Sequence, residues 1–289
     1  MTDVVYVTHE HDPADPHADV DVDIEVALSA FTAAGIDWDV AAWDDRGYDW
    51  SGASLVLVRS PWDYVARRRE FLSWSRDVSA LTRIENPAEV LEANTDKTYL
   101  RELEQRGVRT VPTGWVQTID DVEPVVAQVL GRFGGPLVVK PTVSAGARDT
   151  IRTTHATEAV VHAHTLLAGG RGAMVQPYLD SVDGEGEVCV LVVDGALTHA
   201  VRKTPALTDG GHGDFSAMAE ITPELRATAE HVLASAGADK LLYARVDLVR
   251  DRDGELALLE LELTEPALFL PQHPAAATAL AAGVAARLR

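Results

Sequence analysis

Basic residues are scarce in this chain of 289 residues: 25 lysines and arginines stand against 45 aspartates and glutamates, a formal net charge of −20. Binding of nucleic acid or of an anionic membrane needs a broad basic surface, so we expect neither as a partner. Cysteine is represented by Cys189 alone, which excludes an internal disulfide framework and favours a reducing compartment.

Long apolar runs and a signal sequence are also missing. No stretch approaches the roughly 18 apolar residues that a membrane span requires. The N-terminus, MTDVVYVTHEHD, has neither the basic start nor the apolar run of a signal peptide. Hydrophobic residues make up 46% and charged residues 24% of the chain, which is ordinary for a globular enzyme. These features together predict a soluble, cytoplasmic enzyme.

The N-terminal region alternates between strand and helix patterns. Apolar runs predict strands at 4–7, 38–42 and 55–58, and helical spacing predicts a helix over 24–34. Such alternation predicts a parallel sheet with helices on its faces. Because ligands bind beyond the C-terminal ends of parallel strands, the loops after the first and third strands are candidate substrate sites. The polar side chains in these loops are His9, Glu10, Arg59, Ser60 and Asp63.

The rest of the chain predicts a middle lobe followed by antiparallel pairs. In the middle lobe, strand patterns at 113–116, 137–140 and 173–176 accompany helix patterns at 122–133 and 158–168. Beyond it, Asp194-Gly195 and Asp253-Gly254 are flanked by apolar runs, as is typical of β-hairpins. Thr222-Pro223 predicts a helix start, and the alanine-rich stretch 274–289 a closing helix. The predicted fold class is therefore α/β with α+β lobes.

Three carboxylates crowd onto one face of the second predicted hairpin. In the strand LALLELEL, Glu260 and Glu262 alternate with leucines, and Arg245 and Asp247 share a face of the partner strand. Closing the hairpin brings the two faces together, in a register that the turn alone does not fix. Hard oxygen ligands clustered in this way suit Mg²⁺ held jointly with substrate phosphates. The alternative is a solvated outer face, which is common in antiparallel sheets.

A lysine at the end of the strand at 137–140 precedes a loop of small residues, 142–148. Small residues such as Ser144, Ala145 and Gly146 let backbone N–H groups approach phosphate oxygens, and Lys140 adds a point charge. A purely structural lysine is the alternative. The loop does not match a Walker A sequence, which excludes a P-loop.

Five segments occur in an order that resembles the ATP-grasp superfamily, most closely its glutathione-synthetase-like branch. They are Asp96-Lys97, VVKP at 138–141, MVQPYL at 174–179, VLVVDG ending at 195, and RVDLV with LELTEP between 245 and 266. The resemblance implies an ATP-grasp fold with an N-terminal parallel αβ domain at 1–93, a central lid lobe at 94–175 and a C-terminal antiparallel-sheet lobe at 176–289. It also favours the metal-site interpretation of the acidic hairpin over the solvated face.

The resemblance implies roles for individual residues in an ATP site between two lobes. Lys97 and Lys140 match the lysines that hold the α- and β-phosphates, and the loop 142–148 matches the lid over them. Glu187 matches the acidic ribose ligand. The hinge whose backbone contacts adenine corresponds to Gln176, Pro177, Tyr178 and Leu179. Two Mg²⁺ ions, which Mn²⁺ can replace, would be bridged by Asp247, Glu260 and Glu262.

Two positions depart from the family pattern. Glu262 stands where the family usually has asparagine, which keeps an oxygen ligand but adds charge. Cys189 stands where relatives often have an arginine that faces the phosphates. The missing positive charge would come from Arg202, Lys203 or Arg245, which are also the candidates for neutralising charge that develops during the reaction. For each of these side chains the alternative is a surface ion pair.

The segments VTHE, WDD at 43–45, RSPWDY at 59–64 and THAVRKTP at 198–205 resemble the ligases that close O-ureidoserine to D-cycloserine. That resemblance implies antibiotic biosynthesis by an ADP-forming ligase that acts through an acyl phosphate and cyclises O-ureido-D-serine. Thr264 and Glu265 would meet the amine or carboxylate of this small amino acid, and Trp62 fits a core residue as well as a direct contact.

Other functions stay open from the sequence. The alternatives are an intermolecular amino-acid or dipeptide ligase and a non-catalytic nucleotide-binding module on the same fold. Dimers are common in the resembling family, so a homodimer is compatible with it.

Overall fold

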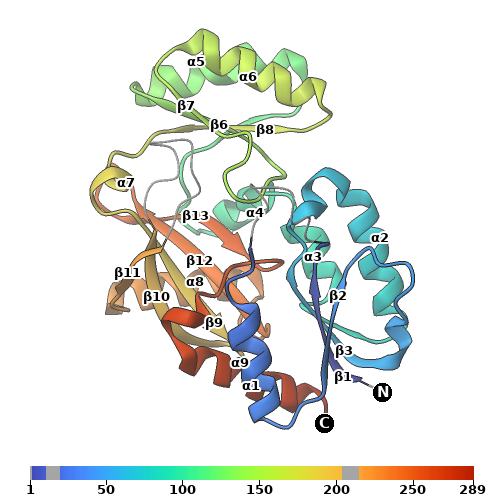
Figure 1. The fold of residues 1–289 in the computed structure, drawn as a ribbon. Helices are drawn as coiled ribbons and strands as arrows, with labels where there is room; N and C mark the ends of the chain where they lie inside the picture. The colour runs from blue at the N-terminus through green and yellow to red at the C-terminus, as the bar shows by residue number, and fades with distance from the viewer. Residues whose placement is uncertain (1, 11–19, 204–214) are drawn as a thin grey trace.

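Three β-sheets organise the protein in a computed structural model that describes residues 2–10, 20–203 and 215–289 (Figure 1). Their strand orders are β2-β1-β3-β4, β5-β8-β6-β7 and β11-β10-β9-β12-β13. The first and last sheets lie side by side, and the central sheet stands above them with its two helices on the far side (Figure 1). No helix in the described ranges is long and apolar enough to span a membrane.

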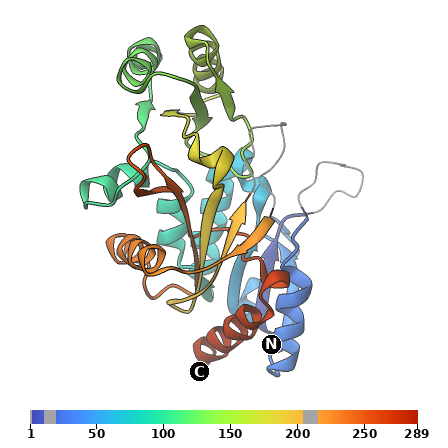
Figure 2. The same ribbon diagram turned by 90° about the vertical axis from the view of Figure 1, so that its left-hand side faces the viewer.

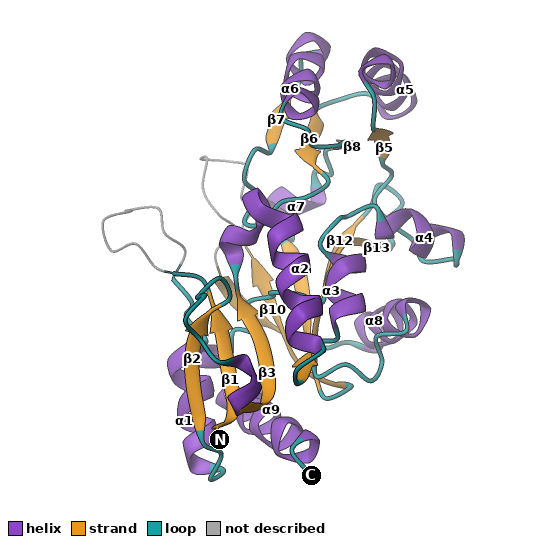
Figure 3. Cartoon of the chain, turned by 90° about the vertical axis from the view of Figure 1, so that its right-hand side faces the viewer, coloured by secondary structure: helices purple, strands orange, loops and turns teal. Residues whose placement is uncertain are grey.

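The N-terminal sheet is parallel and covered on both faces (Figure 3). Its strands are β1 (Thr2–Thr8), β2 (Trp38–Ala42), β3 (Ala53–Ser60) and β4 (Arg83–Glu85). Its helices are α1 (Ile24–Ala33), α2 (Arg68–Ser79) and α3 (Ala88–Asn94), with short 3-10 turns at η1 (Trp50–Gly52) and η2 (Trp62–Arg67). Val4 and Tyr6 pack with α1, whereas Val5 and Val7 pack with α2. Burial on both faces explains why β1 and β3 are almost continuously apolar.

The central sheet is antiparallel and carries helices on one face only. It consists of β5 (Gly114–Val116), β6 (Leu137–Pro141), β7 (Ile151–Thr153) and β8 (Ala173–Pro177), covered by η3 (Ile119–Asp121), α5 (Val122–Phe133) and α6 (Ala156–Ala168). Gly114 allows α5 to approach the sheet, because a Cβ at this position would lie 2.5 Å from Val125 Cγ1. The uncovered face is turned toward the other two sheets (Figure 1).

The C-terminal sheet is antiparallel and packs on both faces (Figure 2). Its strands are β9 (Glu187–Val193), β10 (Ala196–Lys203), β11 (Phe215–Ala219), β12 (Tyr243–Arg250) and β13 (Leu256–Glu262). The accompanying helices are α4 (Tyr99–Gln105), α7 (Ser181–Gly184), α8 (Pro223–Ala236) and α9 (Pro274–Arg287), with a short turn at η4 (Leu270–Gln272). One face packs against α4 and α8, and the other against α1 and α9.

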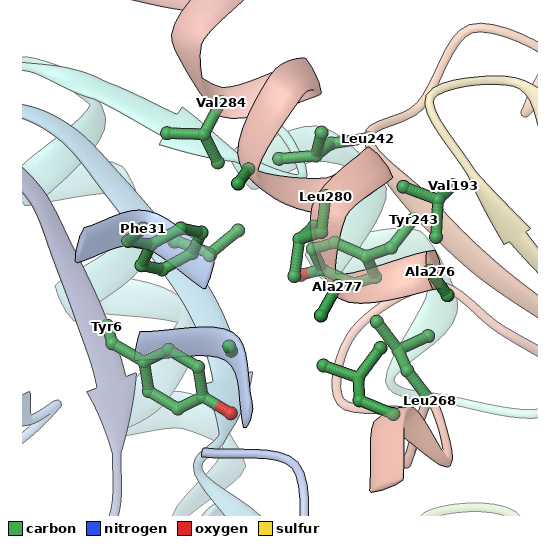
Figure 4. Close-up of a cluster of buried hydrophobic side chains, with 14 of the residues drawn as sticks. Tyr6, Phe31, Val193, Leu242, Tyr243, Leu268, Ala276, Ala277, Leu280 and Val284 are labelled. Atoms are coloured by element: carbon green, nitrogen blue, oxygen red, sulfur yellow. The ribbon is translucent and has the colours of Figure 1, made fainter. Parts of the chain in front are cut away.

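Helix α9 fills the space between the N-terminal and C-terminal sheets (Figure 4). Three of its alanines, at positions 276, 277 and 281, are buried in one cluster with Phe31 of α1 and Leu242. Gly283 permits this close approach, because a Cβ there would lie 2.7 Å from Leu242 Cδ1. Apolar packing of this kind fixes the two sheets against each other, and with them the loops at their ends.

Local sequence signals located most elements. The Asp194-Gly195 turn has the two positive φ angles, +50° and +75°, that a tight hairpin turn requires. Thr222 Oγ1 accepts a hydrogen bond from Leu225 N, as expected of an N-cap. The sequence interpretation did not foresee α2, α3, α7, β4, β7 and β11. Three of these, α7, β4 and β7, are single-turn or three-residue elements.

The proposed domain boundaries at 93/94 and 175/176 stay a prediction. The three sheets occupy residues 2–85, 114–177 and 187–262. Helix α4 packs with α8 against the C-terminal sheet, so the stretch before β5 belongs spatially with that sheet.

Candidate active site

A cavity of about 650 Å³ opens between the central sheet and the C-terminal sheet. Its walls come from the ends of β6 and β8, the face of β12 and β13, and the segment that follows β13. The volume lies within the range usual for small-molecule sites. Polar and charged side chains gather at one end, and apolar side chains at the other.

The acidic hairpin closes in the register that unites the two predicted faces. In the β12–β13 ladder Arg245 pairs with Glu262 and Asp247 pairs with Glu260, and all four side chains line the cavity. Arg245 binds both oxygens of Asp247, from Nε and from Nη2 at 2.8 Å each, and also contacts Glu262. Lys97 Nζ lies 2.9 Å from Glu260 Oε1. The solvated-face interpretation is therefore wrong.

Burial and crowding separate the pKa values of these carboxylates. Burial opposes ionisation of Asp247, but Arg245 and Lys203 outweigh it and lower the pKa of that carboxyl below its usual range. Lys97 likewise outweighs burial at Glu260 and lowers its pKa. Burial raises the pKa of Glu262 to about 8, which Arg245 opposes and the two neighbouring carboxylates reinforce. Among the three carboxylates, the protonated form is thus favoured at Glu262 alone.

Three lysines converge on the polar end. Lys97 Nζ donates to Ser144 O at 2.7 Å, which anchors the small-residue loop next to the carboxylates. Lys203 Nζ lies 2.8 Å from Glu187 Oε1. The Lys140 ammonium makes no hydrogen bond within the described residues, and burial together with the nearby Lys97 lowers its pKa. An anion at this place would oppose both effects and favour the charged ammonium, so the arrangement suits phosphate.

The other end of the cavity is apolar and carries the predicted hinge. Gln176, Pro177, Tyr178 and Leu179 all line it, next to Val111, Val138, Val249 and Leu259. The Gln176 amide donates to Thr113 Oγ1 at 2.8 Å. The N–H of Leu179 donates to no acceptor in the described part of the chain, although the residue is only 6% exposed. An unbonded amide beside apolar side chains fits the edge of a planar heterocycle.

The charges of the cavity fit divalent cations. Its lining holds five carboxylates and four cationic side chains, which give a net charge of −1 when every group is ionised. A bound ATP would add about four negative charges. Asp247, Glu260 and Glu262 offer hard oxygen ligands of the kind that Mg²⁺ takes. A cation bound there would oppose the burial and the like charges that raise the pKa of Glu262.

Three of the predicted substrate residues in the N-terminal loops serve the fold instead. The Arg59 guanidinium is buried over the ring of Tyr243, 4.5 Å from its centroid, and Nη2 donates to Pro266 O at 2.6 Å. Ser60 is fully buried and its hydroxyl donates to Thr8. Asp63 is bound by Trp43 Nε1 at 2.7 Å and by Arg67. The expectation that these side chains face the cavity is corrected, because partners distant in sequence draw them away from it.

The remaining substrate candidates divide. The His9 ring forms a hydrogen bond with Ser60 O at 2.8 Å, and Glu10 is exposed. Thr264 is fully buried, and its hydroxyl donates to Asn94 Oδ1 at 3.3 Å. None of these three lines the cavity, which corrects the expectation for them too. Glu265 does line it.

Arg202 and Lys203 point to opposite faces of β10, as neighbours in a strand must. Lys203 lines the cavity and Arg202 does not, so the expectation that Arg202 reaches the reacting groups is corrected. Cys189 is buried behind the cavity wall, and its Sγ lies within 4.8 Å of carboxylate oxygens of Glu187 and Asp247. The Lys203 ammonium lies beside the same two carboxylates, so it supplies charge next to the position where relatives carry arginine. The last two residues of THAVRKTP lie outside the described residues.

Several lining residues escaped the sequence interpretation. Trp62 lines the cavity and donates its Nε1 to Glu265 O at 3.0 Å, although the sequence did not decide between core and contact. Phe215, Phe269 and Gln272 also line the cavity. The fold-back of the segment after β13 places Phe269 and Gln272, and Phe215 begins β11; no local pattern in the sequence signals either position.

Comparisons with known proteins agree with this geometry. A family model described as D-cycloserine synthetase DcsG, N-terminal domain, matches residues 4–86. The chain is 35% identical over 284 residues to the cycloserine biosynthesis protein DcsG of Streptomyces lavendulae, covering 93% of this chain and 95% of that protein. It matches the crystal structure of D-cycloserine synthetase DcsG with a TM-score of 0.90 at 33% identity, over 99% of each chain.

A more distant likeness concerns the fold alone. The ATP-grasp ligase PsnB, complexed with a phosphomimetic variant of its minimal precursor, Mg and ADP, matches with a TM-score of 0.64 at 18% identity. The match covers 100% of this chain and 99% of that one. The three-sheet architecture is thus that of ATP-grasp ligases.

Proposed function

The chain belongs to the family of the D-cycloserine synthetase DcsG, among the ATP-grasp ligases, and we propose that it closes O-ureido-D-serine to D-cycloserine at the expense of ATP. The observation that carries this proposal is the single cavity in which an apolar end, three lysines and a cluster of carboxylates meet. Such a cavity suits a nucleoside triphosphate with its metal ions and leaves the segment after β13 to meet the second substrate.

Adenine occupies the apolar end in this proposal. The backbone around Tyr178 and Leu179 contacts the base, and Glu187 binds the ribose. The unbonded Leu179 N–H supports this placement, because a buried amide without an acceptor is costly. Lys97 and Lys140 hold the α- and β-phosphates, and the loop with Ser144, Ala145 and Gly146 covers them through its N–H groups.

Asp247, Glu260 and Glu262 hold Mg²⁺ in the same arrangement. Two ions balance the added phosphate charge better than one, since the lining carries −1 once all its carboxylates are ionised, and Mn²⁺ can substitute. The metal supplies neutralisation and orientation of the phosphates. The side chains of Arg245 and Lys203 add positive charge at the place where negative charge develops during phosphoryl transfer.

The reaction needs no nucleophilic side chain. The substrate carboxylate takes the γ-phosphate to give an acyl phosphate and ADP. The nitrogen bound to the side-chain oxygen then attacks the acyl carbon and expels phosphate. Atom balance requires the carbamoyl group to leave, with water, as carbon dioxide and ammonia. The chain contributes by positioning the two reactants and by neutralising charge.

An ADP-release screen tests the proposal. Purified protein is incubated with MgATP and a panel of small amino acids that includes both enantiomers of O-ureidoserine, and products are identified by mass. We expect ADP, phosphate and a cyclised product with the D-enantiomer. A condensed dipeptide would support the intermolecular alternative, no turnover with any amino acid would support the non-catalytic one, and AMP with pyrophosphate would exclude an acyl phosphate.

A further inference from the structure

The backbone at 263–268, which links β13 to η4, is bonded mainly to side chains. Each of its six carbonyl oxygens accepts a hydrogen bond from a side chain. From the carbonyl of residue 263 to that of residue 268, the donors are in order Asn86 (2.7 Å), Tyr243 (3.0 Å), Trp62 (3.0 Å), Arg59 (2.6 Å), Arg245 (3.3 Å) and His199 (3.0 Å). We call this segment the carbonyl strip. Its bonds fix its position without a neighbouring strand.

The bonds to the carbonyl strip come from both lobes of the molecule. Asn86, Trp62 and Arg59 belong to the N-terminal lobe, and the other three donors belong to the C-terminal sheet. Asp23 adds two bonds from the N-terminal lobe, because its carboxylate accepts from Leu268 N at 2.5 Å and from Leu270 N at 2.7 Å. A segment held from two sides in this way is preorganised, which reduces the entropy lost when it binds a ligand.

Glu265 is the part of the carbonyl strip that faces the cavity as a charged group. The other carboxylates of the lining each form an ion pair with a lysine or arginine. Glu265 forms none within the described residues; the partner of its carboxylate is the Tyr64 hydroxyl, which donates to Oε1 at 2.8 Å. Burial raises the pKa of Glu265 to about 7. A largely enclosed carboxylate without an ion pair favours binding a cation.

The position of Glu265 selects which part of an amino acid it can bind. It follows β13 directly beyond the carboxylates proposed to hold Mg²⁺, so the reacting carboxyl of a substrate lies toward the phosphates and lysines. The opposite end of a zwitterion is its ammonium. A second carboxylate beside Glu265 would repel it, whereas an ammonium would complete the missing ion pair.

We propose that Glu265, oriented by Tyr64 and by the carbonyl strip, binds the α-ammonium of the amino-acid substrate and thereby selects substrates that carry a protonated amine. This inference rests on the proposed ligase function and names the residue that recognises the amine. Tyr64 and Arg59 are positioning residues: Tyr64 orients the Glu265 carboxylate, and Arg59 holds the adjoining Pro266 carbonyl.

A comparison of two substrates on two proteins tests the proposal. The substrates are O-ureido-D-serine and its deamino analogue, 3-(ureidooxy)propanoate, and the proteins are wild type and Glu265→Gln. For wild type, we expect removal of the amine to lower kcat/KM by at least about 30-fold, because it leaves the partly buried Glu265 charge without an ion pair. For Glu265→Gln, the amine should change kcat/KM by less than about threefold. The KM for ATP should be unchanged in the variant.

Matched variants separate recognition from folding. Tyr64→Phe keeps the carboxylate and removes one hydrogen bond, so it should raise the KM for the aminated substrate about fivefold and leave the deamino analogue unaffected. Glu255→Gln, an exposed glutamate at the β12–β13 turn, is the charge-matched control. Thermal unfolding and the affinity for MgADP show whether each variant is folded.

The outcomes are distinct. If Glu265→Gln binds MgADP normally but retains the full preference for the amine, the proposal is wrong. The same conclusion follows if Glu10→Gln, in the loop after β1, abolishes the preference instead. If wild type does not turn over O-ureidoserine but accepts another amino acid, the proposed function fails, and the amine comparison is made with that substrate and its deamino form.

Discussion

Replacing Glu262 with glutamine should flatten the pH dependence of stability in the nucleotide-free protein. Burial raises the pKa of this carboxyl from 4.5 to about 8 in the folded chain, against the opposing effect of Arg245. A folded-state pKa above the unfolded one means that the folded protein holds a proton that the unfolded chain releases. The stabilisation is therefore complete below the ordinary pKa of a glutamate and is lost as pH rises toward about 8.

The size of the effect follows from linkage. With a pKa of 4.5 in the unfolded chain and about 8 in the folded one, this group makes the free energy of unfolding fall by about 3 kcal/mol between roughly pH 5.5 and pH 8. The Glu262 side chain is 24% exposed, so solvent screening lessens this figure only in part. Glutamine carries no titratable proton, and Glu262→Gln should lack this slope.

Urea unfolding in the presence of a chelator measures the difference. The six tryptophans provide the signal, and the midpoint and slope are compared at both pH values for wild type, Glu262→Gln and the control Glu255→Gln. Saturating MgADP should also flatten the wild-type profile, because a metal that binds the carboxylate displaces its proton. Parallel profiles for wild type and Glu262→Gln without nucleotide would mean that Arg245 keeps Glu262 ionised, and the reasoning would be refuted.

Three further outcomes are expected. Glu260→Gln should lower ADP release at least about 100-fold, because it removes a charged metal ligand and the Lys97 ion pair. The far-ultraviolet circular dichroism spectrum should stay unchanged. A fully active variant would show that Glu260 is not a metal ligand. Lys203→Met should lower kcat/KM by at least about tenfold, whereas Arg202→Met should stay within about threefold of wild type. The reason is that the two side chains leave opposite faces of β10. Equal losses would contradict the assignment of Lys203 to the active site. Thr222→Ala should lower the free energy of unfolding by about 1 kcal/mol through loss of the N-cap bond, with unchanged KM for ATP, as a chemical denaturation curve and initial rates would show.

The alternation of polar and apolar residues predicted the part of the site that lies on regular strands. Alternation alone placed Glu260 with Glu262, and Arg245 with Asp247, because strand side chains alternate regardless of the rest of the fold. The turn at Asp194-Gly195 and the cap at Thr222 were equally readable, since both depend on residues within a few positions of each other. The lysines and the hinge were predicted from the resemblance to ATP-grasp ligases, in which similar segments follow one another in the same order.

Loops resisted prediction because their side chains respond to distant partners. Arg59 follows a parallel strand, where ligand contacts are common, yet it bonds a carbonyl 207 residues away and stacks on Tyr243. Asp63 is similarly held by Trp43 and Arg67. Such contacts form only when the sheets pack together, and the sequence contains no local record of them.

The sequence by itself determined which side chains share a face, where turns and caps fall, and that the carboxylates lie together. Tertiary structure decided which face meets the cavity: it turned Lys203 inward and Arg202 away, and it left Glu265 without an ion pair among the described residues. The physical reason is range. Alternation and capping arise from the geometry of neighbouring residues, whereas the cavity and the carbonyl strip arise from the docking of lobes whose residues are far apart in the chain.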